Sequence, residues 1–166
     1  MANQVGNIYK NLDPRIRLGV QVVGFAVGIY IIYRLIKGVN TLQQDQQFQS
    51  EEQSTANELT QLNKNPYTRQ KITESQAKSY ANKLYQAMNG LGTDEQQIYS
   101  VFYKLQNDAD FLAIQNAYGT KTISSGSYFV SDVRGTMVTC LSSELDIDET
   151  KKVNDILRSK KIKFRI

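Results

Sequence analysis

The sequence lacks histidine and tryptophan, contains a single cysteine, and has only two prolines among its 166 residues. Without histidine, no imidazole can serve as the base of a catalytic triad or as a general acid–base group. Zinc sites built from cysteine and histidine clusters are excluded for the same reason, and one cysteine permits no disulfide within the chain. The fold must therefore be held by packing, and the scarcity of proline favours long helices over a turn-rich β protein.

Charge is arranged in blocks along the chain. Five bases accompany one acid in residues 1–40, and three bases accompany four acids in 41–72. Residues 73–157 hold seven bases and eleven acids, and the tail 158–166 holds five bases and no acid. Because a nucleic-acid-binding domain usually presents one broad basic face, this pattern predicts no nucleic-acid partner. It is more typical of a chain whose two ends lie near anionic surfaces.

The longest run without charge is Leu18 to Tyr33. A helix of this length measures ~24 Å, against a hydrocarbon core of ~30 Å. The flanking Arg17 and Arg34 can extend their charged groups to the interface, so the sequence predicts one transmembrane helix over about 16–37. A buried helix of a soluble core is the alternative. A cleaved signal peptide fits less well, because no small-residue cleavage site follows the run.

Within this run, Gly24 and Gly28 form a G-x-x-x-G pattern. Two glycines four residues apart leave a flat strip on which another helix can approach closely, so we expect helix packing there and a homo-oligomer formed through it. The alternative is that glycine is simply common in membrane helices.

The remaining chain divides into a stalk and a helical domain. Residues 41–72 are polar and rich in glutamine, with no clean apolar stripe, and predict a solvated helix or flexible tether that builds no core. From 73 to 166 the pattern predicts five short helices and a basic tail. Capping boxes at Thr73 and Thr93 start the first two helices, Asn107 opens the third, and Asp148 caps the fifth. Residues 120–135 are predicted to be irregular, and Cys140 is predicted to lie in the core.

The loop between the first two helices, Met88 to Glu95, is the one motif that suggests a ligand. Gly90 and Gly92 permit a tight loop whose carbonyl oxygens converge, and calcium takes carbonyl and carboxylate oxygens as ligands. The same residues equally describe a good helix–loop–helix joint, in which the acids complement the helix dipole. The residues alone leave both interpretations open.

This loop, Gly90-Leu91-Gly92-Thr93-Asp94-Glu95, preceded by Leu-Tyr-x-Ala-Met, resembles the start of an annexin repeat. The resemblance continues to Leu141-Ser142-Ser143-Glu144-Leu145 and covers residues 74–157. It implies an all-α domain of five helices, similar to single annexin-like repeats of bacterial and bacteriophage proteins. It also implies a calcium site formed by the carbonyls of Met88, Gly90 and Gly92 and the carboxylate of Glu144. In this chain Asn89 stands where a basic residue is common, and extra residues separate the third and fourth helices.

We therefore expect an all-α protein in three parts: an N-terminal segment with a single transmembrane helix (1–40), a stalk (41–72) and an annexin-like domain (73–166). The predicted function is that of a membrane-anchored structural or interaction protein, in a virion internal membrane or a bacterial inner membrane. Its partners are expected to be the lipid bilayer and other virion or membrane proteins. The alternative is a calcium-dependent phospholipid-binding module. An enzyme is not expected, because the acids Glu144, Asp146 and Asp148 fit a helix junction better than a catalytic centre.

Overall fold

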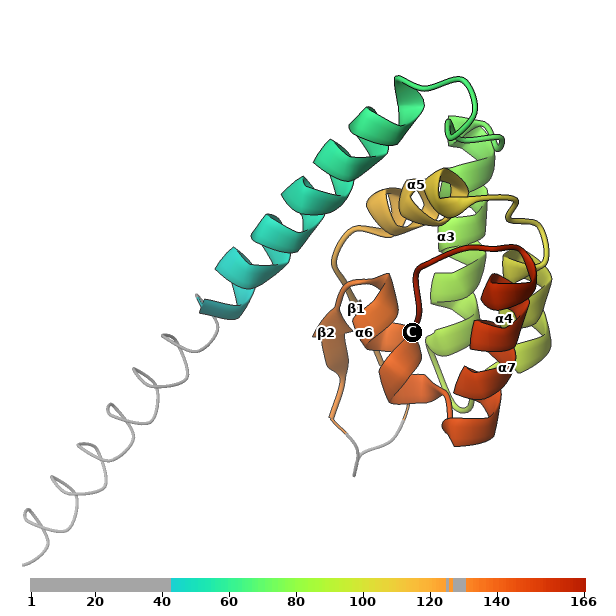
Figure 1. Cartoon of the computed structure of the whole chain (residues 1–166). Coiled ribbons are helices and arrows are strands. Elements are labelled where there is room, and N and C mark those ends of the chain that lie inside the picture. The colour runs from blue at the N-terminus through green and yellow to red at the C-terminus, as the bar shows by residue number, and fades with distance from the viewer. Residues whose placement is uncertain (1–42, 125, 127–130) are drawn as a thin grey trace, which may run out of the picture. The chain divides into compact units, whose positions relative to one another are not determined.

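The computed structural model describes residues 43–124, 126 and 131–166 (Figure 1). The predicted transmembrane helix over 16–37, with Gly24 and Gly28, lies outside the described residues. Within the described ones, no helix has the length and apolar character needed to cross a bilayer. Residues 47–166 form one compact unit.

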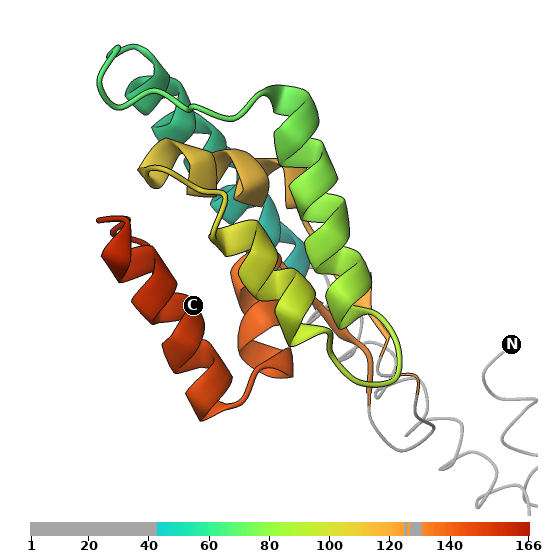
Figure 2. The same ribbon diagram turned by 90° about the vertical axis from the view of Figure 1, so that its right-hand side faces the viewer.

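This unit is mostly helical, as the sequence predicts. A helix over 43–63 precedes the other elements. Those elements are α3 (Glu74–Met88), α4 (Glu95–Phe102), α5 (Asp108–Tyr118), β1 (Lys121–Ile123), β2 (Val133–Gly135), α6 (Met137–Glu144) and α7 (Ile147–Ser159). Helix α3 contacts α4, α5 and α6, and α4 also contacts α7. Figure 2 shows α4 between α3 and α7.

The core forms where the apolar stripes of these helices meet. Ala81 and Leu84 of α3, Ile98 of α4 and Phe111 of α5 are all buried, and Leu157 brings α7 into the same cluster. Cys140 is fully buried, which confirms its predicted place in the core. Burial of such side chains stabilises the fold by roughly 1.5–3 kcal/mol each, before the entropy of ordering the chain is counted.

The polar 43–63 helix also contributes to this core, which the sequence did not predict. Thr55 is buried and Leu59 packs against the core from outside. The Gln115 side-chain amide donates to the Thr55 hydroxyl at 3.1 Å, and the Thr120 hydroxyl donates to Glu52 Oε1 at 2.6 Å. A helix without an apolar stripe is thus attached in part by hydrogen bonds that its polar side chains accept.

Residues 120–135 are not irregular throughout, because they contain a small antiparallel sheet. Lys121 of β1 lies opposite Gly135 of β2, and Ile123 lies opposite Val133. Only Ile123 and Gly135 of these four are buried. Strands of three residues carry too little alternation to be recognised in sequence.

Two of the predicted helix caps are wrong by one or two residues. The cap at Thr73 is confirmed, with its capping box to Gln76. Helix α4, however, is capped by Asp94 instead of Thr93, and α7 by Asp146 instead of Asp148. Thr93 and Asp94 can both accept a hydrogen bond from a helix N–H, and so can Asp146 and Asp148. The local sequence therefore did not decide which residue caps each helix.

A buried carboxylate joins the start of α3 to the start of α5. Asp110 is fully buried. Its Oδ1 accepts the backbone N–H of Lys71 at 2.6 Å and of Ile72 at 3.1 Å, and its Oδ2 accepts that of Gln106 at 2.9 Å. No basic side chain of the described residues forms an ion pair with it. Three backbone donors therefore compensate the burial of this charge.

We predict that Asp110→Ala lowers the free energy of unfolding by about 3 kcal/mol or more, because one buried and two partly buried N–H groups lose their acceptor. Asp110→Asn should cost less, since one side-chain oxygen is kept. The exposed Asp132 is the control, and Asp132→Ala should change stability by no more than about 0.5 kcal/mol. Urea unfolding of the three variants measures this. Equal stability of Asp110→Ala and Asp132→Ala would contradict the prediction.

Candidate functional site

The loop between α3 and α4 turns sharply, in backbone conformations that its glycines allow. Gly90 has φ of 142° and Gly92 has φ of 79°, conformations that side-chain-bearing residues rarely adopt. The N–H of Asp94 donates to the carbonyl of Ala87 at 2.9 Å and closes the loop. A hollow of about 330 Å³ lies against residues 86–87 and 89–94. The loop is thus a concave surface on which Gly90 and Gly92 leave backbone atoms without side chains beside them.

Glu144, at the end of α6, reaches this loop. The Thr93 hydroxyl donates a hydrogen bond to Glu144 Oε2 at 2.9 Å, although 51 positions separate the two residues in sequence. The structure therefore brings the carboxylate named by the annexin resemblance beside the loop that holds Gly90 and Gly92. Met88 ends α3, and its side chain is buried, so only its backbone carbonyl is a candidate ligand.

The candidate ligands at this loop are oxygen atoms of the backbone and the carboxylates of Glu144 and Asp94, and Asp94 Oδ1 already accepts the N–H of Gln97. Among the described residues, no three cysteine or acidic side chains gather closely enough to hold a metal ion. A cation here would have to be bound by carbonyl and carboxylate oxygens, which suits a hard ion such as calcium and no softer metal. Nucleophilic or acid–base chemistry has no histidine, lysine or thiol at this place.

The segment after β1 fixes the loop from the other side. Asn89 Oδ1 accepts the N–H of Ser124 at 2.8 Å, and the N–H of Gly90 donates to the Ser124 carbonyl at 2.9 Å. A Cβ on Gly126 would approach the Leu91 side chain to 2.9 Å, so that glycine allows close packing. Sequence reasoning missed these contacts, because Asn89 gave no sign that its amide would bind a distant backbone.

Three acidic residues lie near Tyr99 on α4. Burial raises the pKa of the Tyr99 hydroxyl, and the negative charges of Glu149, Glu95 and Asp146 raise it further. The Lys152 ammonium lies 4.0 Å from the centre of the Tyr99 ring, a cation–π contact. The acids are N-terminal residues of α4 and α7, where they complement the helix dipoles, so their arrangement has a structural cause.

Cys140 is not a candidate nucleophile. Burial raises the pKa of its thiol, and the thiol donates to the Gly135 carbonyl at 3.6 Å. Burial also raises the pKa of the neighbouring Tyr118 hydroxyl far above its usual range. Because the thiolate is the reactive form, a buried thiol with a raised pKa is inert. The Lys121 ammonium, 5.7 Å from the centre of the Tyr118 ring, covers the outside of this pair.

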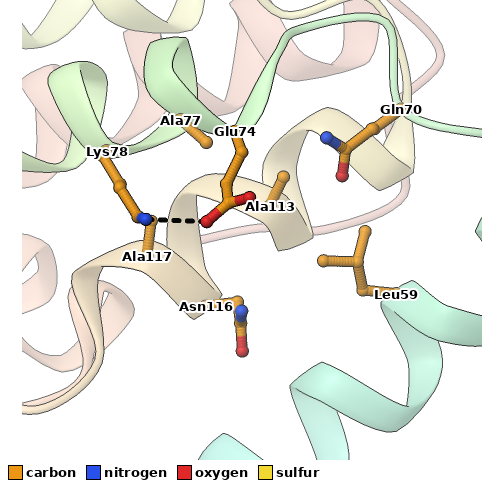
Figure 3. A pocket seen from close by; sticks show the side chains of 8 residues that line it. All are labelled: Leu59, Gln70, Glu74, Ala77, Lys78, Ala113, Asn116 and Ala117. Carbon is orange, nitrogen blue, oxygen red and sulfur yellow. Dashed lines mark hydrogen bonds and ion pairs between the residues drawn. The ribbon is translucent and has the colours of Figure 1, made fainter.

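A further hollow of about 440 Å³ lies between the 43–63 helix, α3 and α5 (Figure 3). Ala77, Ala113 and Ala117 supply small apolar side chains to its wall, and Glu74 and Lys78 form an ion pair at 2.7 Å. The hydrogen bond from Lys78, with its charge, lowers the pKa of the Glu74 carboxyl. The hollow brings together no pair of residues suited to proton transfer or nucleophilic attack.

Comparison with protein-family models, curated proteins and solved structures gives no match to this chain. The annexin resemblance therefore rests on the loop residues and Glu144 themselves.

We predict that Asp94→Ala lowers the free energy of unfolding by about 1 kcal/mol, because the first turn of α4 loses the acceptor for the Gln97 N–H. Thr93→Ala should cost less, since it removes only a half-buried side-chain bond to Glu144. Thermal or urea unfolding of the two variants compares them. A larger loss for Thr93→Ala would show that the contact with Glu144, and not the cap, holds this joint.

Proposed function

We propose that the chain is a membrane-anchored structural or interaction protein, which links a bilayer to a protein partner through its helical domain. In this proposal residues 16–37 cross the membrane once, and Gly24 and Gly28 pack against another helix, in a homo-oligomer. The membrane is a bacteriophage virion membrane or a bacterial inner membrane, as the annexin-like resemblance suggests. The protein is not an enzyme and binds no nucleic acid.

The observation that carries this proposal is that one chain joins an uncharged run suited to a bilayer and a folded unit suited to water. Residues 18–33 contain no charge, whereas residues 47–166 form a compact unit with its own apolar core. Among the described residues, the core of this unit is formed by side chains between residues 72 and 162. A chain of this design gains a fixed place at a membrane from one part and a folded surface for partners from the other.

We predict that the full-length protein requires detergent, whereas a chain beginning at Gln47 is soluble and monomeric. The reason is that the uncharged run 18–33 is lost while the compact unit is kept whole. Sedimentation of both proteins with and without neutral detergent measures this. A full-length protein that is soluble without detergent would refute the anchor.

The second candidate is a calcium-dependent phospholipid-binding module. The observation in its favour is the 2.9 Å contact that places the Glu144 carboxylate beside the Thr93 hydroxyl and the glycine loop. Bidentate carboxylates and several carbonyls make the calcium sites of proteins, and here the annexin resemblance assigns the loop carbonyls and a single carboxylate, Glu144. The Thr93 hydroxyl already occupies one oxygen of that carboxylate, which favours the joint over the metal site.

We predict that calcium raises the melting temperature only slightly, compared with a chelator. A bound ion at a hundredfold excess over its dissociation constant would add about 2.7 kcal/mol, which a thermal melt detects readily. Magnesium serves as the control cation, and Glu144→Gln as the control variant. A large rise that is specific to calcium and vanishes in Glu144→Gln would establish the metal site instead.

A further inference from the structure

Four exposed basic residues surround the first turn of α5. They are Arg69, Lys71, Lys104 and Lys163, and together we call them the basic ring. The Asn107 side-chain amide donates to the carbonyl of Arg69 at 2.9 Å, and the N–H of Lys163 donates to Asp108 Oδ1 at 2.7 Å. The N–H of Lys71 donates to Asp110, and Lys104 belongs to the turn that leads into α5. Segments far apart in sequence thus converge on one helical turn.

The charged ends of the basic ring are available to a partner. Among the described residues, none of its four side chains forms an ion pair. The two carboxylates of this turn bind backbone N–H groups of the same segments: Asp108 Oδ1 accepts that of Lys163, and Asp110 Oδ1 accepts that of Lys71. The carboxylates therefore hold the backbone of the ring in place and leave its side chains in solvent.

The backbone of the ring is held in place, because its lysines stand next to buried residues. Lys71 precedes Ile72, Lys104 precedes Leu105, and Lys163 follows Ile162, and all three neighbours are buried. The tail beyond Lys163 is held as well, since the Phe164 ring stacks on the Phe111 ring at 4.9 Å between centroids. A basic tail that looked free in the sequence is thus a fixed part of the surface.

A small group of exposed cations on one helical turn suits a short acidic segment of a protein better than an extended polyanion. The segments that carry these cations are already in place before a partner arrives, so binding has to order only their side chains. Residues 73–157, which make up most of the domain, carry seven bases against eleven acids. A long nucleic acid or an anionic bilayer would meet this excess of acid, whereas a short segment contacts the ring alone.

We propose that the basic ring is the docking surface for an acidic segment of a partner protein. This inference rests on the proposed function, because it assigns the surface through which the anchored chain holds its protein partner. Recognition consists of carboxylates paired with the four cations, without a metal ion.

The test measures binding of a fluorescent oligoglutamate peptide to the full-length protein, in neutral detergent and with chelator present. The ring variant is Lys104→Gln with Lys163→Gln, which leaves the backbone bonds of Arg69 and Lys71 intact. The control is Lys78→Gln with Lys151→Gln, which removes the same charge from exposed lysines that pair with acids of their own helices. We expect the ring variant to bind about tenfold more weakly, and the control to bind like the unchanged protein.

Several outcomes would overturn the proposal. An equal loss in both variants would show an effect of net charge, and no loss in either would remove the ring as the site. Tighter ring-dependent binding to single-stranded DNA or to phosphatidylserine vesicles would assign another class of partner. Ring-dependent self-association in sedimentation would make a second copy the occupant. Binding is measured in detergent, so it does not depend on whether residues 16–37 cross a membrane. If they do not, the full-length protein will be soluble without detergent, and the binding result will be unaffected.

Discussion

The helical domain depends on one buried charge. The Asp110 carboxylate accepts N–H groups from the segment before α3 and from the turn before α5, and it has no cation to offset its burial within the described residues. Removing a carboxylate from water is costly, so it is tolerated only where several donors are held in place. The position of α5 against α3 is fixed by this requirement, and the 43–63 helix and the tail both pack against α5 or its neighbours.

The joint between α3 and α4 shows how the same residues serve two physical roles. Gly90 and Gly92 take conformations that turn the chain sharply, and this also exposes their carbonyls. Thr93 then ties the joint to Glu144, while Asn89 ties it to the segment after β1. Each of these bonds satisfies a polar group that a metal ion would otherwise attract. A helix joint stabilised in this way needs no ion for its fold.

Local patterns in the sequence predicted what local forces decide. The stripe and cap of α3 were correct, because Thr73 and Gln76 cap each other within one turn. The sheet was missed because strands of three residues show too little alternation, and the Asn89 contact with Ser124 was missed because it joins residues 35 positions apart. Thr55 was missed as well, since a buried threonine in a glutamine-rich helix looks solvated until Gln115 provides its partner. For the loop, the residues gave only the glycines, and Glu144 came from the resemblance.

Charge is separated along the helices of the domain, and this bears on where a partner can bind. The N-terminal ends of α4 and α7 carry Glu95, Asp146 and Glu149, whose charges act together on Tyr99. The basic ring lies instead where α5 begins and where the tail returns. Acids at helix N-termini stabilise the fold, and so their positions are explained without a ligand. Backbone hydrogen bonds bring the segments of the ring together, and its cations form no ion pair within the described chain, so they are available to the acidic partner proposed above.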